Sequence, residues 1–173
     1  MADRLLDLAR QEGSPESFAL AYHAQIVVSF FRGLLVELED HWTQWNTSRD
    51  APGYRQRPGS VVVVRNYASL NSWMLGYADS AGRRMAETIA LARAIEDPYE
   101  IAFARFFESL LHCLLRDASR ATTAARQALA LSEEHGFSWP KVALARNPGV
   151  GASAARQPRR GSLVDSTESG RLC

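Results

Sequence analysis

The strongest constraint on this chain is an internal repeat, because a repeat of fixed length limits the architectures that the chain can adopt. Residues 8–21 and residues 91–104 align without a gap at an offset of 83, and six positions are identical. Residues 128–137 form a weaker copy of residues 88–97, at an offset of 40. The longer offset therefore corresponds to two units of about 41 residues each.

The expected turns recur with the same period. Gly33 and Gly76 lie 43 residues apart, and Arg116 with Asp117 marks a further turn about 41 residues on. Units of this length are typical of helical hairpins that stack on their neighbours. We therefore predict an all-α chain of antiparallel helical hairpins stacked as a short α-solenoid.

Capping residues locate the helices within each unit. Asp97 can accept a backbone N–H at a helix start, Pro98 suits the first turn, and Glu100 completes a capping box. Gly136 can end the following helix in the left-handed conformation. Apolar residues recur at three- and four-residue spacing between these signals. The predicted helices span residues 2–12, 15–32, 34–45, 59–75, 79–95, 98–115 and 118–135.

Three segments depart from this pattern. Residues 61–64 are four consecutive valines, which suits a strand, but their place in the period favours the first helix of a hairpin. Residues 46–58 are polar and rich in proline and glycine, so we predict a loop. Residues 148–173 lack apolar periodicity and predict a disordered tail rich in arginine, glycine and serine. The helical domain is accordingly expected over residues 1–147.

Several short motifs resemble a known class of helical repeat. They are Trp-Met-Leu-Gly-Tyr-Ala-Asp-Ser-Ala at residues 73–81, Leu-Ala-Arg at 91–93 and Asp-Pro at 97–98. The chain is similar here to the tetratricopeptide-like region at the C-terminal end of large bacterial signalling proteins. These proteins include class III adenylate/guanylate cyclases and STAND-type regulatory ATPases. The resemblance covers residues 2–145 and implies a tetratricopeptide-like solenoid.

The chain departs from this class at both ends. The class would continue after Trp139 with another helical pair, and residue 1 falls inside what would be the second helix of an earlier repeat. We therefore expect a truncated or frame-shifted fragment of a larger protein. The enzymatic activity of the class is not expected, because none of its catalytic residues lies in this chain.

Composition is consistent with a cytoplasmic protein. The formal net charge of +1 implies no general attraction to nucleic acid or anionic membranes. The two cysteines, Cys113 and Cys173, suggest no disulfide framework. The first residues are not typical of a signal peptide, and no apolar run is long enough to span a membrane.

No motif predicts a catalytic, cofactor or metal site. Lys141 is the single lysine and lies outside any Gly-Lys-Ser/Thr sequence, so a phosphate-binding loop is not predicted. Residues 149–154 match G-x-G-x-x-A, but no strand precedes them, as a dinucleotide site requires. The histidines show no metal-ligand spacing; they are His23, His41, His112 and His135.

The resemblance implies a binding face instead. In tetratricopeptide-like folds the first helix of each hairpin lines a concave groove. This pattern places six candidate partner-binding residues in that groove: His23, Phe30, Asn66, Trp73, Phe106 and Cys113. The expected partner is another protein or another domain of a parent polypeptide, not a membrane. Two copies of the chain are also expected to associate as a homodimer through uncapped repeat ends.

Three hypotheses about function follow. The first is a protein–protein interaction or regulatory module without catalytic activity of its own. The second is that the chain forms part of a cyclase or ATPase polypeptide. The third is a DNA-associated regulator that uses Arg156, Arg159 and Arg160, although this basic cluster is short and lacks aromatic neighbours.

Overall fold

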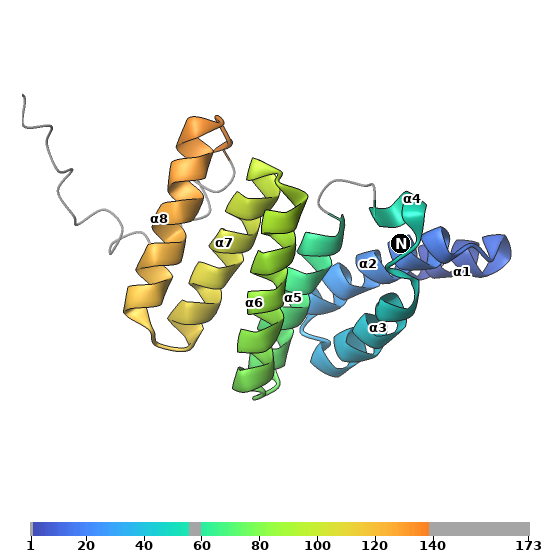
Figure 1. The fold of residues 1–173 in the computed structure, drawn as a ribbon. Coiled ribbons are helices and arrows are strands. Elements are labelled where there is room, and N and C mark those ends of the chain that lie inside the picture. Colours follow the sequence, from blue (N-terminus) through green and yellow to red (C-terminus); the bar gives the residue numbers. More distant parts are fainter. Residues whose placement is uncertain (1, 56–59, 139–173) are drawn as a thin grey trace, which may run out of the picture.

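The computed structural model describes residues 2–55 and 60–138, and within these ranges the chain is all-α (Figure 1). The predicted all-α class is therefore confirmed, while the tail prediction for residues 148–173 lies outside the described residues. The helices are α1 (Ala2–Glu12), α2 (Pro15–Arg32), α3 (Leu35–Ser48), α4 (Pro52–Arg55), α5 (Ser60–Met74), α6 (Ala78–Ile95), α7 (Pro98–Leu114) and α8 (Ala118–Glu134).

The start of α7 and the end of α2 carry the capping residues that the sequence predicts. The Asp97 carboxylate accepts hydrogen bonds from the backbone N–H groups of Tyr99 at 2.8 Å and Glu100 at 3.4 Å. Gly33 ends α2 at a φ of 71°, in the left-handed region that favours glycine. Arg116 takes a similar φ of 59° at the turn after α7. These caps fix where most hairpin turns occur.

The predicted loop over residues 46–58 differs from the structure. Helix α3 continues to Ser48, and Pro52–Arg55 form the short helix α4. Helix α4 contacts α2 and α5. Tyr54 of α4 and Ala51, just before this helix, are both buried in the core. Part of the predicted loop is therefore helical and packs against the core, where burial of the Tyr54 ring stabilises it.

The helices pair as successive hairpins, α2 with α3, α5 with α6 and α7 with α8. The first helices of neighbouring hairpins also touch, since α2 contacts α5 and α5 contacts α7. Figure 1 shows the hairpins side by side, from α2 and α3 near one end to α8 at the other. Helix α1 packs on α2. None of the described helices is long and apolar enough to cross a lipid bilayer.

Two apolar clusters form the core, and α5 contributes to both. One cluster contains Val62 and lies among α5, α6, α7 and α8. The other contains Val64 and lies among α2, α3, α4 and α5. The four valines of residues 61–64 are therefore helical, as predicted from their place in the repeat. Burial on both sides of a central helix outweighs their preference for strands.

Candidate interaction face

Five aromatic rings form a continuous strip across the first helices of the three hairpins. Phe31 of α2 lies 5.7 Å from Tyr67 of α5, measured between ring centroids. Tyr67 lies 5.1 Å from Phe107 of α7, and Phe107 lies 5.0 Å from Phe103. Tyr99, one turn earlier on α7, stacks on Phe103 at 6.2 Å. We call these five residues the aromatic strip.

The two ends of the aromatic strip face solvent. The side chain of Phe31 is 72% exposed, and that of Tyr99 is 41% exposed. Phe107 and Phe103 are buried and form the floor between them. Burial raises the pKa of the half-buried Tyr67 above its usual value, so its phenol stays neutral. The strip therefore presents an uncharged aromatic surface with two rings available for contact.

Three predicted groove residues lie near this surface or against the core beside it. Phe30 is half-buried, with its ring 4.9 Å from Tyr67 and 5.8 Å from Phe31. Trp73 and Cys113 are also half-buried, and both pack against the cluster formed by α5 to α8. Burial raises the pKa of the Cys113 thiol, so this thiol ionises less readily than a cysteine exposed to solvent.

Asn66 and Phe106 lie in the interior, where a partner cannot reach them. Adjacent residues of a helix point about 100° apart, so a one-residue error changes the face completely. The residues that join the strip are Tyr67 and Phe107, each one position further along the chain. Tyr67 and Phe107 occupy matching positions of the repeat, at an offset of 40, whereas the corresponding residue of α2 is Ala24. Phe31 joins the strip from a later turn of α2, so the repeat alone does not reveal the strip.

His23 lies in a polar contact at the junction of α2, α3 and α4, apart from the aromatic strip. Its Nδ1 is 3.2 Å from the hydroxyl oxygen of Tyr54. The same oxygen accepts a hydrogen bond from Nε1 of Trp45 at 2.9 Å. Burial lowers the pKa of His23 below its usual value of 6.5. His23 therefore contacts α4 through Tyr54 and is neutral in the folded protein at pH 7.

The pKa of His23 predicts a loss of stability in mild acid. The unfolded chain takes up a proton on His23 as the pH falls through 6.5, whereas the folded protein resists protonation. The free energy of unfolding should therefore fall from that pH down to the lowered pKa. Urea denaturation at about pH 7.5 and about pH 5.5 measures the loss. His23→Gln should show a smaller loss of stability between the two pH values. His135→Gln, at an exposed site, should show the same loss as the unmodified chain.

Two buried asparagines of α5 predict opposite mutational effects. Neither amide atom of Asn66 has a hydrogen-bond partner. The Nδ2 of Asn71, by contrast, donates to the Leu35 carbonyl at 3.0 Å and to Glu39 Oε2 at 3.2 Å. Asn66→Leu should raise the free energy of unfolding by about 1 kcal/mol, and Asn71→Leu should lower it by about as much. Thermal and urea denaturation measure both; a loss for Asn66→Leu would contradict the expectation.

The aromatic strip presents exposed rings to solvent at both of its ends. Among the residues that the structure describes, no group of three or more His, Cys, Asp or Glu side chains is placed to hold a metal ion. In comparisons with known proteins, no family model, no curated protein and no solved structure matches this chain. The aromatic strip crosses the first helices of three hairpins, and the functional proposal below is based on it.

Proposed function

We propose that this chain is a helical-repeat module that binds a protein partner through the aromatic strip, without catalytic activity of its own. In this proposal the three hairpins act as a short tetratricopeptide-like α-solenoid. The observation that carries it is the continuous ring contact from Phe31 through Tyr67 to Phe107, which crosses three hairpins. A surface built from several repeats is the kind of surface that solenoids use for binding.

The strip favours a partner segment with apolar side chains on one face. Exposed aromatic rings anchor protein interfaces because they bury a large apolar area at a small cost in conformational entropy. Phe31 and Tyr99 stand at the two exposed ends, with a buried aromatic floor between them. An amphipathic helix or an extended apolar segment would cover both rings and the floor together.

The resemblance of residues 73–81 to the repeats of bacterial signalling proteins supports a regulatory role. On this basis we place the module in the cytoplasm and expect its partner to be another protein or another domain of the same polypeptide. Association of two copies through the ends of the repeat array is the alternative use of the exposed apolar residues. These include Leu5 and Leu8 at one end, and Leu114 and Leu115 near the other.

Site-specific photo-cross-linking tests the proposal. A photoreactive phenylalanine replaces Phe31 in one variant and Ala90, which is exposed on α6, in a matched control. We expect a specific cross-linked protein from position 31 and none from position 90. The partner so identified is then titrated with purified chain. Phe31→Ser and Tyr99→Ser should each weaken its binding about tenfold, and Ala90→Ser should leave it unchanged.

Equal cross-linking from positions 31 and 90 would contradict this proposal, because it would indicate contact without a preferred face. A partner whose affinity is unchanged by both serine variants would contradict it as well. Circular dichroism of each variant provides the folding control. Phe31 and Tyr99 are 72% and 41% exposed, so their replacement should leave the helical spectrum intact.

A further inference from the structure

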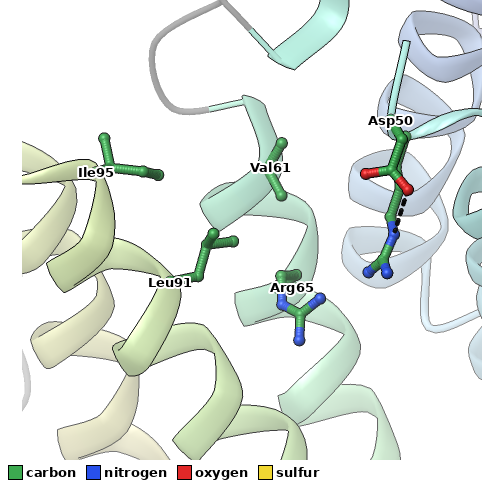
Figure 2. A pocket seen from close by; sticks show the side chains of 6 residues that line it. Asp50, Val61, Arg65, Leu91 and Ile95 are labelled. Atoms are coloured by element: carbon green, nitrogen blue, oxygen red, sulfur yellow. Dashed lines mark ion pairs between the residues drawn. The ribbon is translucent and has the colours of Figure 1, made fainter. Parts of the chain in front are cut away.

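A second surface feature lies away from the aromatic strip. A hollow of about 300 Å³ opens where the turn after α3 meets α5 and α6 (Figure 2). Arg65 of α5 faces this hollow, and Tyr67 of the strip lies two residues further on, about 200° around the helix. Among the residues that the structure describes, those that line the hollow are Arg49, Asp50, Val61, Arg65, Leu91 and Ile95.

Two arginines supply hydrogen-bond donors at one side of the hollow. The side chain of Arg65 is only 11% exposed, and one of its terminal nitrogens donates to Glu87 Oε2 at 2.6 Å. Its Nε is buried and has no hydrogen-bond partner, and the same holds for the Nε of Arg49. The carboxylate of Asp50 is 3.9 Å from the Arg49 Nε and its side chain is 75% exposed. Both guanidinium groups therefore retain donor capacity.

The electrostatic environment of Arg65 favours an additional anion. Burial is the largest influence on Arg65 and lowers its pKa. Glu87 opposes that effect, and the positive charges of Arg49 and Arg84 lower the pKa further. A negative group between Arg49 and Arg65 would reduce both the desolvation penalty and the repulsion between these arginines.

Away from Asp50 and the two arginines, the described residues that line the hollow are apolar. Figure 2 shows Leu91 and Ile95 projecting from α6 toward Val61 of α5, with Arg65 one turn further along α5 and Asp50 on the opposite side. A ligand that matches both the arginines and the apolar side chains carries an anionic group at one end and an aliphatic group at the other. A dianion such as phosphate is less suitable, because Asp50 and Glu87 would repel its second charge.

We propose that this hollow binds a carboxylate carried on a short aliphatic group. Guanidinium groups bind the planar carboxylate through paired N–H donors, and the aliphatic part packs on Val61, Leu91 and Ile95. Two sources offer this chemistry, a small aliphatic acid and the C-terminal residue of a peptide. Binding here uses residues outside the aromatic strip, so it does not depend on the function proposed for that strip.

Nuclear magnetic resonance of the full ¹⁵N-labelled chain tests the proposal. The Nε–H signals of Arg49 and Arg65 are assigned from the variants Arg49→Lys and Arg65→Lys. Hexanoate is titrated in one arm, with hexanamide and hexylamine as neutral and cationic controls. A blocked tripeptide ending in leucine is titrated in the other arm, with a free or an amidated C-terminus. Inorganic phosphate serves as the dianion control.

We expect a saturable shift of both Nε–H signals with hexanoate or with the free-carboxylate peptide, and the arm that binds more tightly identifies the source. Hexanamide, hexylamine and the amidated peptide should cause no saturable shift. Arg65→Lys should weaken binding at least tenfold, because a lysine cannot form the paired contact. Arg93→Lys, at an exposed site on α6, and Phe31→Ser should leave it unchanged.

The proposal would be overturned if hexanoate and hexanamide bound equally well, or if phosphate bound more tightly than hexanoate. Absence of binding in both arms would also overturn it. Unchanged affinity in Arg65→Lys would also overturn it. If that variant loses its helical spectrum, Arg49→Lys gives the same comparison at a less buried side chain. In that case, unchanged affinity of Arg49→Lys for hexanoate would overturn the proposal.

Discussion

Trp45→Ala is expected to lower the free energy of unfolding by about 4 kcal/mol. Trp45 is fully buried in the cluster formed by α2, α3, α4 and α5. Its ring stacks on Trp42 with centroids 5.2 Å apart, and its Nε1 donates to the Tyr54 hydroxyl. Alanine removes the ring and this donor together, so both the packing of α3 and the attachment of α4 are weakened.

Urea denaturation followed by circular dichroism measures this loss, and two further variants separate its causes. Trp45→Phe keeps most of the apolar volume but removes the N–H donor, so it should cost about 1 to 2 kcal/mol. Val36→Ala, at an exposed site on the same helix, should change the free energy of unfolding by less than about 0.5 kcal/mol. A loss in Trp45→Ala no larger than that of Val36→Ala would contradict the assigned role.

Helix positions were predictable because their signals are local. Asp97 and Pro98 mark the start of α7 by capping chemistry that involves only neighbouring residues. The four valines of residues 61–64 needed the repeat period as well, since their intrinsic preference favours a strand. Helix α4 was not predicted, because four residues are too few to show the apolar periodicity of a helix. Its stability comes from Tyr54, whose ring packs into a core built from distant helices.

The side-chain face of each helix was less predictable than the helix itself. The repeat indicates which helices come first in each hairpin, but it does not fix their rotation. Packing between hairpins sets that rotation, and it buries Asn66 and Phe106 while Tyr67 and Phe107 join the aromatic strip. The hollow beside α5 was invisible in the sequence, because Arg49, Arg65 and Leu91 come from three separate segments.

The second large effect is expected from a polar network that joins α3, α5 and α6. The guanidinium of Arg84 forms an ion pair with Glu39, and its Nη1 donates to Ser72 Oγ at 2.7 Å and to the Ala68 carbonyl at 3.2 Å. It also lies 5.1 Å from the centroid of the Trp42 ring. Arg84→Ala should lower the free energy of unfolding by about 2 kcal/mol, because it removes several hydrogen bonds and leaves the half-buried Glu39 carboxylate without its main counter-charge.

A double-mutant cycle isolates the contribution of this ion pair. Glu39→Ala and Arg84→Ala are made singly and together, and we expect a coupling energy of about 1 to 2 kcal/mol. The matched control is Asp7 with Arg10, an exposed ion pair at 2.9 Å on α1, whose coupling should be at most about 0.5 kcal/mol. Added salt should weaken the control pair more than the shielded pair. Equal coupling energies in the two cycles would show that Arg84 stabilises the hairpin stack through its neutral contacts alone.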